Sequence, residues 1–176
     1  MEKAKKIMLV SASIAVCIIL VFSLGGCAQR VATKMIEKAL EQSGAGDVDI
    51  NLDKGEVNIT DEEGNEMSIG GADLPKDWPS VVPVSKDIQV QSTFSQTTDG
   101  KKGWTVIGLF KGSGKSLYEY YKKEFSGWDE QSDFTSDQGD DGKTYSYQVS
   151  NDKYFVTVWV FESADENTIT LSVNEQ

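Results

Sequence analysis

The sequence contains no histidine among its 176 residues. Without an imidazole, a Ser-His-Asp or Cys-His catalytic unit cannot form, and neither can a zinc site that depends on histidine. Basic residues are also scarce, since 17 Lys and Arg stand against 28 Asp and Glu, for a formal net charge of -11. A chain this acidic is repelled by phosphate backbones, which argues against nucleic acid as a partner. These absences exclude several classes of function and identify none.

Both cysteines of the chain, Cys17 and Cys27, lie near the N-terminus. Cys17 falls within an apolar run over residues 7–24 that follows three lysines, and the run ends in Leu24-Gly25-Gly26-Cys27. Positive charge before an apolar span favours keeping that end inside the cell, so we expect the rest of the chain to be exported. The ending resembles a bacterial lipobox, in which the final cysteine is acylated and becomes the new N-terminus after cleavage.

This resemblance implies a role for each residue of the motif. Cys27 would carry the acyl chains, palmitate among them, and Leu24, Gly25 and Gly26 would be recognised by the signal peptidase. Two or three acyl chains on one cysteine anchor a protein durably, whereas a single chain holds it only marginally. We therefore expect a lipoprotein that faces the extracytoplasmic side of the cell membrane and is held there by the lipid on Cys27.

The alternative to a cleaved signal peptide is an uncleaved transmembrane helix, because the apolar run is near the length that spans a bilayer. A disulfide between Cys17 and Cys27 requires both residues in one mature chain. Cys17 lies in the segment 1–26 that cleavage would discard, so we expect no internal disulfide.

Residues 27–73 are expected to form the lipidated N-terminus, a short helix and a β-meander. A helical period with Gly44 as its stop predicts the helix over residues 31–43. From Asp47 the period changes to two, and turns before Val57 and Met67 divide the segment into three strands. The apolar side of these strands carries Val48, Ile50, Leu52, Val57, Ile59, Met67 and Ile69.

All three prolines lie within residues 74–86, which predicts an extended linker there. The pattern Leu-Pro-x-Asp-aromatic-Pro-x-x-Val-Pro begins at Leu74 and is followed by strands, a helix rich in Tyr and Lys, Gly127-Trp128 and more strands. This layout, over residues 47–174, resembles that of a group of uncharacterised bacterial lipoproteins. The resemblance contains no catalytic motif and implies an extracytoplasmic location alone.

Residues 87–176 are expected to form an α+β domain with the order β-β-α-β-β-β-β. That order indicates a mainly antiparallel sheet with one packed helix. The helix is predicted from Ser113 or Ser116 to Phe125, with tight turns at Asp99-Gly100 and Asn151-Asp152. The strands are predicted at residues 88–95, 104–111, 130–135, 143–150, 154–161 and 168–173.

The strand over residues 154–161 is apolar at both parities, which is typical of an internal strand with two covered faces. One side carries Tyr154, Val156, Val158 and Val160, and the other Phe155, Trp159 and Phe161. We expect the meander to cover part of the second face. The strand over residues 168–173 alternates apolar with hydroxyl side chains, so we expect one of its faces to be exposed to solvent.

The string Gly112-Ser113-Gly114-Lys115-Ser116 lies between a strand and a helix, as a phosphate-binding loop would. A P-loop also needs a glycine five residues before Gly114, and Leu109 stands there. We therefore predict no nucleotide site. The structural interpretation is that this string begins a helix, which is capped by Ser113 or by Ser116 and Glu119 as a capping box.

Two acidic groups are candidate calcium ligands. In the first, the position of the bidentate glutamate of an EF-hand loop is occupied by Gln148, so the ligand set is incomplete. The second is a row of side chains on one strand, which more often serves solubility. The residues considered are Asp137, Asp141 and Gly142 in the first group and Asp47, Asp49, Asn51 and Asp53 in the second. We predict no metal and no cofactor.

Aromatic side chains are the third candidate, because flat rings bind sugars and a surface lipoprotein meets wall glycans. Leu117, Tyr121 and Phe125 follow helical spacing, so we expect them in the core, with Trp128 at the end of the helix. Tyr118 and the Trp78 of the proline-containing segment are the aromatic residues that we expect to be exposed.

No residue is predicted to be catalytic. A glycosidase needs a particular pair of carboxylates, and nothing distinguishes one pair among so many acids. Ser113 or Ser116 with Lys115 shows no signature of a catalytic dyad. The expected function is a non-catalytic interaction module of the cell envelope with a protein as partner, and the alternative is binding of a cell-wall glycan or a divalent cation.

Overall fold

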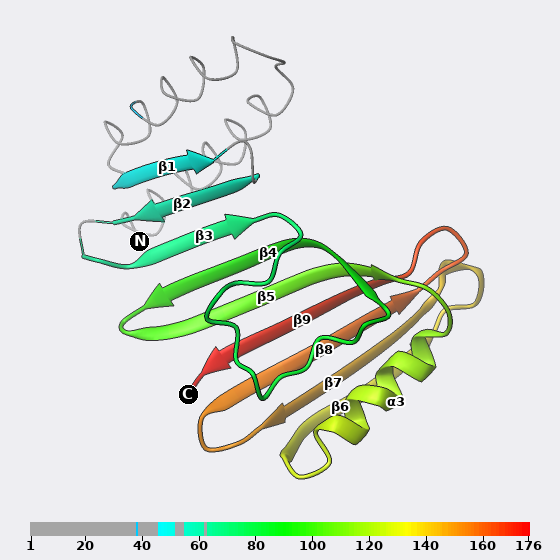
Figure 1. The fold of residues 1–176 in the computed structure, drawn as a ribbon. Coiled ribbons are helices and arrows are strands. Elements are labelled where there is room, and N and C mark those ends of the chain that lie inside the picture. The colour runs from blue at the N-terminus through cyan, green and yellow to red at the C-terminus, as the bar shows by residue number, and fades with distance from the viewer. Residues whose placement is uncertain (1–37, 39–45, 52–54, 62) are drawn as a thin grey trace, which may run out of the picture. The chain divides into compact units, whose positions relative to one another are not determined.

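The computed structural model describes residue 38 and residues 46–51, 55–61 and 63–176 (Figure 1). They belong to two compact units, of which the first ends at Ser68 and the second covers Ile69–Gln176. The described residues contain nine β-strands and the helix α3 (Gly114–Glu124). The lipobox residues, the predicted helix over residues 31–43, Leu52 and Asp53 lie outside the described residues.

The first unit contains a two-stranded antiparallel pair whose alternation decides which face is buried. β1 (Asp47–Asn51) pairs with β2 (Glu56–Thr60), and Asp47 and Asp49 of β1 are exposed. The apolar residues between them are buried in two cross-strand pairs, Val48 opposite Ile59 and Ile50 opposite Val57. The predicted strands at β1 and β2 are confirmed, because the period of two places their described apolar side chains on one face.

The strand β3 (Glu66–Gly70) begins after a tight turn and crosses from the first unit into the second. The Asp61 carboxylate shapes that turn by accepting hydrogen bonds from the backbone amides of Glu63 and Asn65, at 2.9 and 2.8 Å. An aspartate that bonds backbone groups two and four residues ahead favours a turn over a continued strand.

The second unit contains six strands in the order β4-β5-β9-β8-β7-β6, all antiparallel to their neighbours (Figure 1). Their bounds are β4 (Ile88–Thr98), β5 (Lys101–Phe110), β6 (Asp129–Asp137), β7 (Lys143–Ser150), β8 (Tyr154–Glu162) and β9 (Thr168–Glu175). The predicted element order is confirmed, with α3 between β5 and β6. The last strand, β9, lies between β5 and β8, which no local pattern in the sequence shows.

The hairpin turns of this unit follow from their residues. Asp99 and Gly100 have φ angles of 54° and 76°, and two consecutive residues with positive φ make the two-residue turn that matches the twist of the flanking strands. Between β7 and β8, the side-chain oxygen of Asn151 accepts hydrogen bonds from the amides of Lys153 and Tyr154. Both turns lie where they were predicted.

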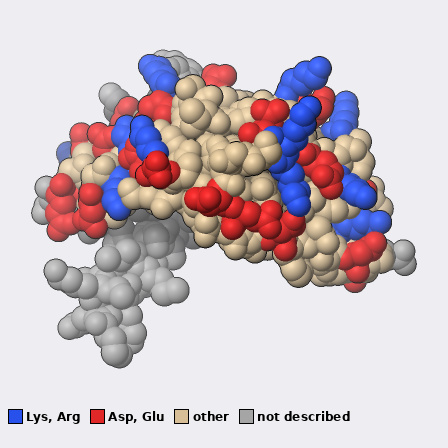
Figure 2. Space-filling model, turned by 90° about the horizontal axis from the view of Figure 1, so that it is seen from below, with Lys and Arg blue, Asp and Glu red and all other residues tan. Residues whose placement is uncertain are grey.

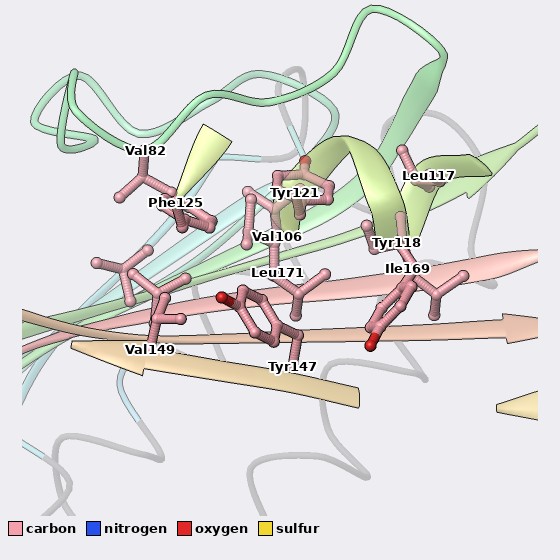
Figure 3. Packing of buried hydrophobic residues seen from close by; sticks show 14 of the residues in the cluster. Val82, Val106, Leu117, Tyr118, Tyr121, Phe125, Tyr147, Val149, Ile169 and Leu171 are labelled. Carbon is pink, nitrogen blue, oxygen red and sulfur yellow. The ribbon is translucent and has the colours of Figure 1, made fainter. Parts of the chain in front are cut away.

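The core of this unit lies between α3 and one face of the six strands (Figure 3). Leu117 and Tyr121 of the helix and Phe125, its C-cap residue, are buried, as predicted, with Tyr121 at 0% and Phe125 at 1% exposure. Trp128, beyond the helix, packs on Phe125 with ring centroids 5.0 Å apart. The strands contribute Val106, Tyr147, Val149, Val156, Val158, Val160, Ile169, Leu171 and Val173. Each fully buried large side chain stabilises the fold by about 1.5 to 3 kcal/mol.

Residues 74–86 form neither helix nor strand, but they pack on this core instead of serving as a bare linker. Val82 is 1% exposed and accepts a hydrogen bond of 2.8 Å from the indole nitrogen of Trp78 through its carbonyl oxygen. The Asp77 carboxylate accepts hydrogen bonds from the Trp104 indole at 3.1 Å and from Lys102 Nζ at 2.6 Å. Asp77 therefore has a structural use, which is to fix this segment to β5.

The strand β8 is internal, between β9 and β7, as predicted. The side that carries Val156 and Val158 is buried in the core. On the other side Phe155 and Phe161 are half-buried, and Trp159 is 53% exposed. The second side is thus covered only in part, as predicted, and Trp159 lies in its exposed part; parity shows which side chains share a face and not whether anything packs on it.

Candidate functional site

The face of the six strands opposite α3 and the core is organised in rows. Directly paired residues of antiparallel strands lie on the same face, so the strand registers give each row from β4 to β6. The middle row is Ser92, Ile107, Thr170, Trp159, Ser146 and Phe134. One flanking row is Gln89, Leu109, Thr168, Phe161, Thr144 and Ser136. The other flanking row is Phe94, Thr105, Ser172, Thr157, Gln148 and Ser132. We call these three rows the uncharged face.

No position in these rows holds a charged residue, although 26% of the chain is charged. Elsewhere, acidic and basic side chains are spread over the surface that Figure 2 shows. Serine and threonine fill more than half of the rows, and apolar side chains fill most of the rest. Contact with this face therefore rests on hydroxyl and apolar groups, since it has no side chain that could form an ion pair.

The middle row carries the exposed apolar side chains. Ile107 is 46%, Trp159 is 53% and Phe134 is 56% exposed. They stand on β5, β8 and β6, which are every second strand of the sheet, and Thr170 and Ser146 lie between them. Neighbouring strands are about 4.8 Å apart, so these three side chains follow one another at about 10 Å. Within the described residues, the other large exposed hydrophobic side chains, Leu74 and Val81, belong to the segment 74–86.

Hydroxyl groups separate and flank these apolar side chains. A hydroxyl both donates and accepts hydrogen bonds, so it can pair with either kind of group on a ligand. Thr105 Oγ1 and Ser172 Oγ, which are opposite each other in one flanking row, lie 3.0 Å apart and bond to each other. The face thus offers alternating apolar and hydroxyl contacts on a rigid sheet, and it contains no carboxylate, amine or thiol that could perform acid-base or nucleophilic chemistry.

The glycine-rich string over residues 112–116 contains the start of α3. Ser113 is the N-cap residue, although its side chain makes no capping hydrogen bond. The backbone amide of Gly114 instead donates to Glu162 Oε2 at 2.5 Å, so a carboxylate of the chain itself lies at the positive end of the helix dipole. A Cβ at Gly114 would lie 3.0 Å from Glu162 Cβ and 3.2 Å from Val160 Cγ1, so a larger residue would be crowded here. Ser116 lies inside the helix, so the capping box of Ser116 and Glu119 is wrong.

The acidic residues considered as calcium ligands do not converge. Asp137 pairs with Lys143 at 3.0 Å and also accepts a hydrogen bond from the Gly139 amide. Asp47 and Asp49 point away from the buried face of β1. In the part of the chain that the structure describes, no group of three or more acidic or cysteine side chains could hold a metal ion.

Tyr118, which was predicted to be exposed, is buried at 5% exposure, so that prediction is wrong. Its hydroxyl donates to the Asp133 carboxylate of β6, and Lys122 Nζ bonds the same carboxylate at 2.5 Å. Lys122 and Tyr118 hold the pKa of Asp133 below its usual value, while burial and the neighbouring carboxylate raise the pKa of Tyr118 to about 12. Trp78, the other aromatic residue expected outside, is half-buried. Tyr118, Lys122 and Asp133 therefore connect α3 to the edge strand β6, which is a structural role.

The variant Asp133→Asn should reveal this cluster through the pH dependence of stability. The folded-state pKa of Asp133 is lowered, so its carboxylate stabilises the fold above the unfolded pKa of about 3.9 and stops doing so as pH falls through the folded value. We expect the free energy of unfolding of the wild type to exceed that of the variant by about 1 kcal/mol at neutral pH. In urea titrations between neutral and strongly acidic pH, the gap should close below about pH 4. A gap of the same size at every pH would contradict the ion pair.

Sequence reasoning missed the uncharged face, although a signal for it was present. Alternate positions avoid charged residues over long stretches of these strands, for example Ser132, Phe134 and Ser136 on β6 beside the charged Asp133. That pattern predicts a charge-free side for each strand taken alone. The alignment of Ile107, Trp159 and Phe134 in one row needs the strand order and registers, which local patterns do not contain.

Comparison with known proteins assigns no function to this face. In the part of the chain that the structure describes, no helix has the length and apolar character needed to cross a bilayer. The chain matches no protein-family model, no curated protein and no solved structure.

Proposed function

We propose that this protein is a lipid-anchored, extracytoplasmic binding module of a bacterial cell envelope. The anchoring part of the proposal rests on the sequence of residues 1–27. Lysines precede the apolar run, and Leu24-Gly25-Gly26-Cys27 has the form of a lipobox. The likeness of residues 47–174 to bacterial lipoproteins supports the same location.

The uncharged face is the observation that carries the binding part of the proposal. Monomeric proteins seldom leave large apolar side chains aligned on a surface unless the surface meets a partner. Here Ile107, Trp159 and Phe134 are aligned in one row on rigid strands, with hydroxyl groups between them. The envelope component that binds this face is therefore one that needs no ion pair.

Catalysis is not part of the proposed function. The chain has no histidine, and Cys27, the one cysteine that would remain after cleavage, would be blocked by lipid. Asp133 and Tyr118, two of the ionisable groups with shifted pKa values, are engaged in contacts that hold α3 to β6. A module that is held at the membrane and binds through a neutral face needs none of these groups to react.

The proposal can be tested by photo-cross-linking on intact cells. A photoreactive phenylalanine analogue in place of Ile107 lies on the uncharged face, and the same analogue in place of Val81 is a matched control in the 74–86 segment. The two residues have similar exposure, 46% and 56%. We expect envelope material to be captured from position 107 and not from position 81, and the second substitution Trp159→Ala should abolish the capture. Equal capture from both positions, or none from either, would contradict binding by this face.

A further inference from the structure

We propose that the ligand of the uncharged face is a neutral, extended β-1,4-linked glycan that lies across the strands along Ile107, Trp159 and Phe134. This inference rests on the proposed function, because it names the class of ligand for the same face. Three properties of the face carry it: its charge, its composition and the spacing of its apolar side chains.

The absence of charge selects against charged ligands. Nucleic acids, anionic lipids and acidic polymers are bound through Lys and Arg, and the three rows contain neither. The protein is also strongly acidic, so its net charge repels an anionic ligand. A neutral chain rich in hydroxyl groups approaches this face without that repulsion, and binding it leaves no buried charge unpaired.

The composition of the face differs from that of a protein interface. The buried centres of protein interfaces are enriched in Arg, Met, Tyr, Trp and Phe, and serine is depleted there. The rows contain Trp159 and three phenylalanines but no Arg, Met or Tyr, and serine and threonine, not aromatic residues, predominate. Hydroxyl side chains match the alternating donors and acceptors of a sugar, and the rings of Trp159 and Phe134 match the apolar C–H face of a pyranose.

The spacing of the middle row fits a periodic ligand. Ile107, Trp159 and Phe134 are separated by two strands each, a distance of about 10 Å. The disaccharide repeat of an extended β-1,4-linked chain is close to that distance, so every second sugar ring would meet one apolar side chain. The rings between them would lie over Thr170 and Ser146, whose hydroxyl groups can donate to and accept from sugar hydroxyls.

The experiment is a fluorescence titration of the full lipidated protein in a polyoxyethylene detergent, which contains no sugar. Chitohexaose and cellohexaose are the probes, and Trp159 is an exposed reporter on the face. We expect a saturable change in tryptophan emission. Maltohexaose has α-1,4 links and a coiled chain, so it should produce no change.

Two variants locate the binding. Phe134→Ala keeps the reporter and removes the apolar contact on β6, so it should weaken binding about tenfold, as the loss of one ring contact does. Val81→Ala removes an equally exposed apolar side chain outside the face and should bind as wild type does. No response to either β-linked probe, an equal response to maltohexaose, or unchanged binding by Phe134→Ala would each overturn the inference.

These outcomes are distinguishable from failure of the proposed function. If the glycans give no response but cross-linking from position 107 still depends on Trp159, the face binds another component, and the glycan inference alone is wrong. If wild type is a dimer in sedimentation and Phe134→Ala is a monomer, a second copy of the chain occupies the face, which also overturns the glycan inference. If neither cross-linking nor titration responds, both proposals are wrong.

Discussion

Replacing Phe125 by alanine is expected to lower the free energy of unfolding by about 3 to 5 kcal/mol. Phe125 is 1% exposed, and its ring lies 6.0 Å from that of Tyr121 and 5.0 Å from that of Trp128, measured between centroids. Truncation removes these contacts and leaves a cavity at the end of α3 that a close-packed core fills only in part. Small domains are stable by about 5 to 15 kcal/mol, so this variant should be close to unfolding. Urea unfolding followed by circular dichroism measures the loss.

The matched control for this prediction is Phe134→Ala. The same atoms are removed, but the side chain is 56% exposed and lies on the uncharged face. Exposed positions of this kind usually change stability by no more than about 0.5 kcal/mol. Similar losses in Phe125→Ala and Phe134→Ala would contradict the division into a core side and an exposed side.

Replacing Cys27 by serine is expected to abolish acylation. Serine lacks the sulfur that carries the acyl chains in lipoproteins, so the lipobox resemblance implies that this variant also keeps residues 1–26. Metabolic labelling with an alkyne analogue of palmitate should mark the wild type and leave Cys27→Ser unmarked. The intact mass of the variant should be that of the uncleaved chain.

The control for lipidation is Cys17→Ser, which changes the other cysteine and leaves the lipobox intact. It should be labelled and cleaved as the wild type is, because Cys17 lies in the discarded segment. If the wild-type chain keeps residues 1–26 and takes up no label, the apolar run is a transmembrane anchor. The lipobox interpretation would then be wrong, although the folded part would still be outside the cell.

The strands and the helix were largely predictable because their patterns are local. A period of two places β7 over Lys143–Ser150, as the structure has it, and hydroxyl alternation identifies the buried side of β9. The turn at Asp99-Gly100 follows from residues that tolerate positive φ. Helical spacing likewise identified the buried residues of α3, except Tyr118. The Tyr118 hydroxyl donates a hydrogen bond to Asp133 of β6, and the sequence of the helix alone does not predict that partner.

The role of residues 74–86 shows where local reasoning stops. Their prolines correctly exclude helix and strand, and the same prolines favour the prediction of a linker. The structure makes the segment part of a packed unit, since Asp77 reaches Trp104 and Lys102 of β5, and Val82 enters the core. These partners are more than 20 residues away in the chain, and no spacing rule connects them.

The sequence by itself determined the acidic, histidine-free chemistry, the resemblance to a lipobox at Cys27, the element order and the two sides of each strand. Only the tertiary structure decided that β9 lies between β5 and β8, that α3 and residues 74–86 cover one side, and that Trp159 stays exposed on the other. The physical reason is that parity is a property of one strand, whereas a surface is made by several strands in register. Ile107, Trp159 and Phe134 become one row only when the pairings of β5, β9, β8, β7 and β6 are known.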